Sequence, residues 1–154
     1  MGCRKASRRL QHITVPLAAQ GAAQIAARAG RSIIKAMTLL DWDEDALAEG
    51  LRCYCNREFF AAHEHWESVW LRSDEPEKTF LQALIQIAAA FHHLQRGNRI
   101  GAASLLRAAY RRLQPYPAAF GALNVEAIRT SVRAWLAALE AGDSAPGLPF
   151  PAIR

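Results

Sequence analysis

The sequence predicts an all-α protein, a compact antiparallel bundle of about five helices built from helical hairpins around one central apolar helix. Apolar residues recur at three- and four-residue spacings along most of residues 41–141, as in amphipathic helices. Signals that start and stop helices divide this stretch, and no segment alternates as a strand does. The 154 residues are 51% hydrophobic and 21% charged, which suits one soluble domain with a buried core.

The first two predicted helices form a hairpin. Asp41 or Asp43 can cap a helix that ends near Cys55, because a short side-chain oxygen there satisfies free backbone N–H groups. A tight corner at residues 56–57 then leads into a second helix over residues 58–72.

The third predicted helix is the centre of the bundle. Asp74 followed by Glu77 resembles a capping box, and Pro76 suits a first helical turn. The helix is expected to run to Arg96 and to stop at Gly97. It is apolar almost all round, which is typical of a helix packed between others.

Two more helices are expected, over residues 98–114 and 124–141, separated by a proline-containing break. The chain is therefore divided into a basic, poorly ordered extension over residues 1–36, a helical domain over residues 37–141, and a proline-rich extended tail over residues 142–154.

The N-terminal extension carries the positive charge. Residues 1–36 hold seven basic residues and no acid, whereas the rest of the chain holds 12 basic and 14 acidic residues. Such a composition resembles an organelle transit peptide or a basic arm, and a third interpretation begins translation at Met37. The protein is expected in the cytoplasm, or in a plastid or other organelle if the extension is a transit peptide.

The three cysteines, Cys3, Cys53 and Cys55, do not make a disulfide framework. Cys53 and Cys55 lie two apart on a predicted helix and face different ways, so they offer too few ligands for zinc. They are interpreted as reduced thiols, which fits an intracellular protein.

Residues 96–133 hold seven arginines and one acid. A solvated surface is the favoured interpretation, and an anionic partner is the alternative. Nucleic acid is not favoured, because no binding motif accompanies the arginines. No transmembrane segment is predicted, and an exposed apolar helix face would be compatible with a homo-oligomer.

The second and third predicted helices carry polar residues on faces that should be buried. His63 and Glu67 lie one turn apart within an arc of large aromatic residues, and Gln82, Gln86 and His93 lie along one side of the next helix. Burying a charge without a partner is costly. The two faces are therefore expected to meet, with His63, Glu67, Gln86 and His93 within mutual hydrogen-bonding range.

Three interpretations of this interior cluster remain open. It can be a satisfied polar network that fixes how the helices pack. It can be a ligand or catalytic pocket in which Glu67, its pKa raised by desolvation, acts as a base beside His63. It can hold a metal ion through His63, Glu67 and His93, with Glu64 as an additional ligand. His65 points away from this arc and is expected to be exposed.

A set of residues resembles a known family. The set is Phe60, Ala62, His63, Glu64, Glu67, Trp70, Leu84, Ile85, Gln86, Ala88, His93, Gly97, Asn98, Gly101, Ala102 and Leu106. Over about residues 42–115 this pattern, with its His-Glu-x-x-Glu block, resembles the domain of unknown function 309 family. The resemblance implies a small all-α antiparallel domain and no particular activity. The candidate polar site is His63, Glu64, Glu67, Trp70, Gln82, Gln86 and His93.

The expected function is therefore binding of a small ligand or a metal ion by an interior polar cluster. The alternative is a non-enzymatic scaffold or interaction module, directed at an anionic partner, whose polar cluster is purely structural. No serine or cysteine lies at a spacing that indicates a nucleophile, and the sequence indicates no particular cofactor or reaction.

Overall fold

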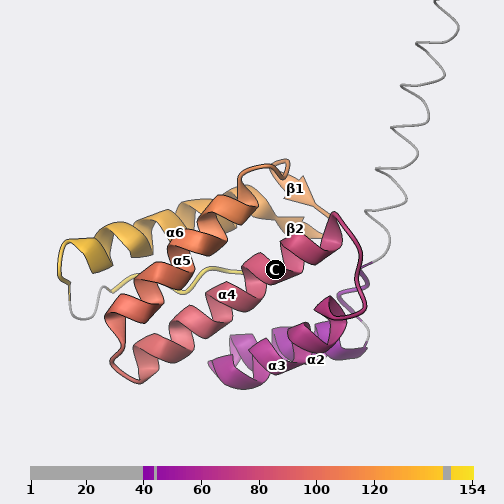
Figure 1. The fold of residues 1–154 in the computed structure, drawn as a ribbon, viewed down its shortest axis with the longest axis horizontal. Coiled ribbons are helices and arrows are strands. Elements are labelled where there is room, and N and C mark those ends of the chain that lie inside the picture. Colours follow the sequence, from indigo (N-terminus) through magenta and orange to yellow (C-terminus); the bar gives the residue numbers. More distant parts are fainter. Residues whose placement is uncertain (1–39, 44, 144–146) are drawn as a thin grey trace, which may run out of the picture. The chain divides into compact units, whose positions relative to one another are not determined.

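Helix α4 (Glu77–Gln95) lies between α3 (Phe59–Trp70) and α5 (Arg99–Leu113). Helix α2 (Asp45–Cys55) packs on α3, and α6 (Val125–Glu140) packs on α5, as Figure 1 shows. The computed structural model describes residues 40–43, 45–143 and 147–154. Over this part of the chain the predicted all-α bundle with a central helix is confirmed. The expectations for residues 1–36 and for a start at Met37 lie outside the described residues.

The central helix supplies much of the core, as its composition predicts. Phe80, Leu84, Ile87 and Phe91 are all fully buried. None of the helices in the described ranges combines the length and the hydropathy needed to cross a lipid bilayer.

The start of α4 differs from the predicted capping box. Glu75, rather than Asp74, supplies the carboxylate: its oxygens accept hydrogen bonds from the backbone N–H of Thr79 at 3.1 Å and from the Thr79 hydroxyl at 2.8 Å. Asp74 contributes only its backbone carbonyl, which accepts from Lys78. Glu77, the other predicted member of the box, is instead buried at 4% exposure.

A short β-hairpin between α5 and α6 corrects the prediction that the chain has no strand. Strands β1 (Ala119–Phe120) and β2 (Leu123–Asn124) pair antiparallel, with Gly121 at a φ of 58° in the turn. Two-residue strands are too short to show alternation in a sequence. The hairpin places the Asn124 side chain where it accepts a hydrogen bond from Ala127 N at 3.0 Å and so caps α6.

A glycine allows α2 and α3 to approach closely. Trp66 of α3 is fully buried, and its indole N–H donates to the carbonyl of Leu47 on α2 at 3.3 Å. Gly50 lies under this ring, where an added Cβ would stand 2.4 Å from Nε1 of Trp66. The indole therefore occupies the space that any other residue at position 50 would need.

The C-terminal segment, residues 147–154, contains no helix or strand and runs alongside α4 (Figure 1). The Phe150 ring lies with its centroid 4.8 Å from that of Phe91, 5.2 Å from that of Phe59 and 5.6 Å from that of Trp135. The segment thus closes an aromatic cluster formed by α3, α4 and α6.

Two further contacts and the burial of Ile153 hold this segment. The Trp135 indole donates to the Pro149 carbonyl at 2.9 Å, and Ile153 is 2% exposed. Arg154 pairs with Asp43 at 2.5 Å. A boundary at residue 142 remains a prediction, but these contacts favour counting the segment in the helical domain.

Replacing Gly50 by alanine is expected to destabilise the fold by about 1–3 kcal/mol, because the new methyl group overlaps the buried indole of Trp66. Thermal unfolding followed by circular dichroism measures the change. Gly147→Ala is the matched control, because nothing lies within 4 Å of a Cβ at that position. Equal melting temperatures for the two variants would contradict the packing described here.

Replacing Phe150 by alanine is expected to cost about 3 kcal/mol, since the ring contacts three buried aromatic side chains. Chemical denaturation gives the free energy of unfolding. Ala152→Ser, at an exposed position in the same segment, should leave stability unchanged. A loose tail would make both substitutions neutral.

Candidate functional site

The predicted polar residues of α3 lie at the rim of the α3–α4 interface rather than inside it. The Glu67 side chain is 48% exposed, and its carboxylate lies 3.9 Å from Nε2 of His63, which is 28% exposed. The expectation that Glu67 is buried is therefore wrong. Among the described helices, only α2 and α4 pack extensively on α3, so the buried face of α3 is narrower than the aromatic arc suggested. Glu64 is exposed and Trp70 half-buried.

The polar residues of α4 have partners on α5 and in the loop before it that the sequence pattern does not predict. Gln82 and Gln86 both accept hydrogen bonds from the Arg112 guanidinium on α5, at 3.1 and 3.2 Å. The amide nitrogen of Asn98 lies 2.9 Å from Nδ1 of His93. Between the described residues, no hydrogen bond joins either α3 residue of the predicted cluster to these α4 residues. The predicted mutual hydrogen bonding is thus not found there.

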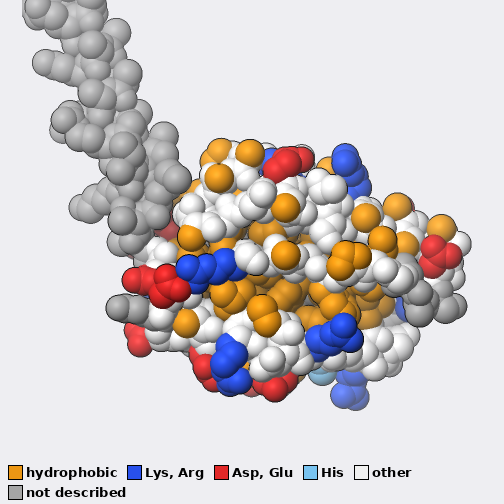
Figure 2. All heavy atoms as spheres, turned by 180° about the vertical axis from the view of Figure 1, so that it is seen from behind, with side chains coloured by type: hydrophobic (Ala, Val, Ile, Leu, Met, Phe, Trp, Pro, Cys, Tyr) orange, Lys and Arg blue, Asp and Glu red, His pale blue; other side chains and the backbone are white. Residues whose placement is uncertain are grey.

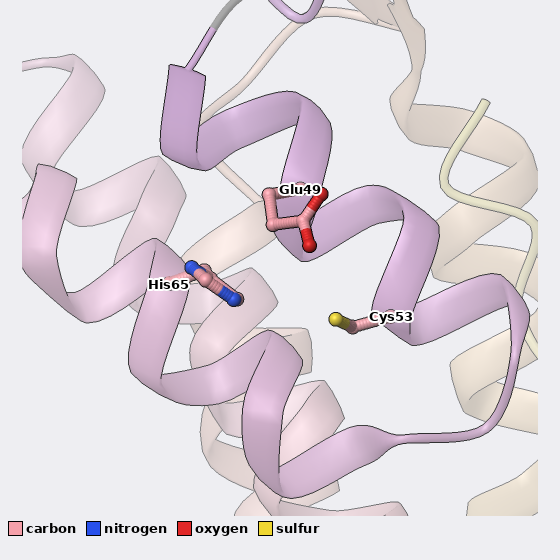
Figure 3. Close-up of side chains that lie close together, drawn as sticks. All are labelled: Glu49, Cys53 and His65. Atoms are coloured by element: carbon pink, nitrogen blue, oxygen red, sulfur yellow. The ribbon is translucent and has the colours of Figure 1, made fainter.

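A different set of potential metal ligands comes together between α2 and α3. Within the described ranges, ligand atoms of Glu49, Cys53 and His65 lie within 4.8 Å of one another. Figure 3 shows Glu49 and Cys53 on α2 directed toward His65 on α3. The predicted trio of His63, Glu67 and His93 is not brought together in this way.

The backbone explains this arrangement. Glu49 and Cys53 are four residues apart on α2, so they share one side of the helix. His65 adjoins Trp66, whose ring packs against Gly50 of the same helix. His65 is half-buried, so the expectation that it is exposed is wrong.

The carboxyl group of Glu49 and the thiol of Cys53 are in different protonation states. Two hydrogen bonds from Arg52 to Glu49, at 2.6 and 3.1 Å, lower the pKa of Glu49, and His65 adds a smaller effect in the same direction. Cys53 is 2% exposed, and burial raises the pKa of its thiol. Glu49 is therefore ionised and Cys53 protonated at neutral pH.

The three side chains match the ligands that zinc and similar ions prefer. Thiolate, imidazole and carboxylate bind zinc at about 2.0–2.3 Å, which places tetrahedral ligand atoms roughly 3.3–3.8 Å apart. The observed separations need a contraction of about 1.5 Å or less, within reach of side-chain rotation. Three protein ligands would leave a fourth position for water or another molecule.

A groove on another part of the surface is lined mainly by apolar side chains. This groove of about 580 Å³ lies between α6 and the C-terminal segment, lined by Ala134, Trp135, Leu148 and Pro149 among others. Figure 2 shows the hydrophobic side chains that gather across the middle of the rear face. Among the described residues that line the groove, Glu126 is the only charged one, so these residues do not form a set of groups suited to catalysis.

Residues 47–105 match the model of a family described as a domain of unknown function (DUF309). Over these residues the match confirms the resemblance noted from the sequence. The matched segment contains both the His-Glu-x-x-Glu block and the three grouped side chains between α2 and α3. Comparison with curated proteins finds no match.

The two described cysteines should react at different rates. Cys53 is buried with a raised thiol pKa, whereas Cys55 is exposed. In the native protein, iodoacetamide should modify Cys55 more than about ten-fold faster, because only an accessible thiolate reacts. Peptide mapping by mass spectrometry measures both rates, and denaturant should make them similar. Equal native rates would show that Cys53 is not enclosed.

Proposed function

We propose that this domain binds a divalent transition-metal ion, with zinc the best match, through Glu49, Cys53 and His65. The grouping of their three ligand atoms within 4.8 Å of one another is the observation that supports it. Carboxylate, thiolate and imidazole together suit zinc and disfavour magnesium or calcium, which take oxygen ligands. The ion would join α2 to α3 and keep one coordination position open.

Binding should release a proton from Cys53. The buried thiol is protonated in the metal-free protein, and a metal ligand must be the thiolate. Affinity should therefore rise with pH, by about ten-fold per pH unit while one proton is released.

Arg52 competes with the ion for Glu49. Its guanidinium holds both carboxylate oxygens of Glu49, so this pair must open or rearrange when the carboxylate turns toward a metal. The pair is exposed, with side-chain exposures of 58% for Arg52 and 43% for Glu49, and so costs little to break.

Titration of metal-free full-length protein with Co²⁺ tests the proposal. One equivalent should bind and produce the near-ultraviolet charge-transfer absorption of a cobalt–thiolate bond. Cys53→Ser should abolish that absorption, whereas Cys55→Ser, at an exposed cysteine on the same helix, should retain it. His65→Ala should weaken binding by more than the ~10–100-fold typical of outer-shell residues.

One further variant separates this site from general surface binding. Arg52→Gln frees the Glu49 carboxylate and removes a nearby positive charge, so it should strengthen metal binding. A wild-type protein that binds no stoichiometric metal, or a Cys53→Ser variant that binds it unchanged, would overturn the proposal.

The same cysteines support a reducing compartment, and we propose the cytoplasm. Cys53 and Cys55 are both free thiols, and such thiols persist where glutathione and thioredoxin keep proteins reduced.

A further inference from the structure

The side of α4 between α3 and α5 is only partly covered. The residues along this flank are Gln82, Ile85, Gln86, Ala89 and His93, all half-buried, whereas Phe80, Leu84 and Phe91 on the inner side are fully buried. Figure 1 shows α3, α4 and α5 side by side. We name this surface of three helices the open face.

The two borders of the open face carry opposite charge. On α3, Glu64 and Glu67 are exposed. On α5, Arg111 is exposed, and Arg112 donates to neutral oxygens, those of Gln82 and Gln86 and the Ala108 carbonyl. Among the described side chains, neither arginine forms a salt bridge.

The opposite charges stand at similar positions along α4. The Lys78 Nζ lies 5.1 Å from the centroid of the Trp70 ring, and the ring centroids of Phe60 and His92 lie 5.3 Å apart. Helix α3 therefore runs antiparallel to α4, and Glu67 lies beside the first half of α4. Arg112 reaches the same half of α4 from the other side, through Gln82 and Gln86.

We propose that two copies of this chain associate through the open face, related by a two-fold axis parallel to α4. That rotation places α3 of one copy on α5 of the other. Glu67 then faces Arg112 of the second copy, Glu64 faces Arg111, and both contacts occur twice. Ile85 and Ala89 of the two copies meet at the centre.

Charge complementarity favours a second copy of the chain as the partner, and it favours a two-fold axis parallel to α4. A two-fold axis perpendicular to α4 would stack α3 on α3 and set acid against acid, which is unfavourable. Phe60 adds an apolar group, 53% exposed, at one border of the face.

The open face is large enough for a small specific interface. Helices α3, α4 and α5 have 12, 19 and 15 residues and are therefore about 18, 28 and 22 Å long, and three helices side by side are roughly 25 Å wide. The resulting area of about 570 Å² is close to the ~600 Å² per partner at the lower end of specific interfaces. None of the three proposed metal ligands is among the residues named on this face, so either proposal can fail alone.

Exchange of charges between two variants tests the interface. The full-length wild type should sediment as a dimer at about 50 µM and dissociate as salt screens the pairs. Glu67→Lys and Arg112→Glu should each be monomeric, because both contacts between positions 67 and 112 become repulsions. Mixed in equal amounts they should form a heterodimer, since both contacts are restored, and native mass spectrometry resolves it from the homodimers.

Two further measurements keep the test decisive. Circular dichroism checks that Arg112→Glu is folded; if it is not, Glu64→Lys and Arg111→Glu replace the pair, because both positions are exposed. Arg133→Glu, an exposed charge on α6, should leave the dimer intact. A monomeric wild type, or folded variants whose mixture stays monomeric, would overturn the proposal.

Discussion

The contact between Gly50 and Trp66 determines how the first helical hairpin is built. An indole occupies the space of a missing Cβ and donates to the Leu47 carbonyl, which holds α2 close to α3. The same approach brings Glu49 and Cys53 within reach of His65. The core under α3 and the proposed metal site therefore both depend on one small residue. A larger side chain at position 50 would push α2 away from α3 and so disturb the core and the metal site together.

The helices could be predicted because their signals are local. Apolar spacing and breakers such as Gly97 act within a few residues, and each described helix begins and ends close to its predicted bounds. The predictions that were wrong concern features that depend on finer geometry or on contacts between residues distant in sequence. Glu75 replaces Asp74 at the start of α4 because one residue of phase decides which carboxylate meets a free N–H. The packing of Phe150 depends on three helices that its own sequence does not specify.

The candidate site shows the same division. Periodicity correctly grouped residues by helix face, but it overestimated burial at Glu67, because depth depends on how many neighbours a helix has. Arg112 was assigned to a solvated surface, yet it bonds Gln82 and Gln86 across 30 and 26 residues. The four-residue spacing of Glu49 and Cys53 is visible in the sequence, whereas their proximity to His65 requires α2 and α3 to be docked.

The packing of residues 147–154 has a consequence for how the domain is divided. The stretch recognised by the family model stops at residue 105, within α5, whereas Phe150 rests on Phe59 and Phe91 inside that stretch. In an excised 47–105 fragment those rings would be exposed to solvent and would promote aggregation. The segment that the family model matches is thus shorter than the segment that packs as one domain. A fragment for expression should therefore extend through residue 154 rather than stop at the family boundary.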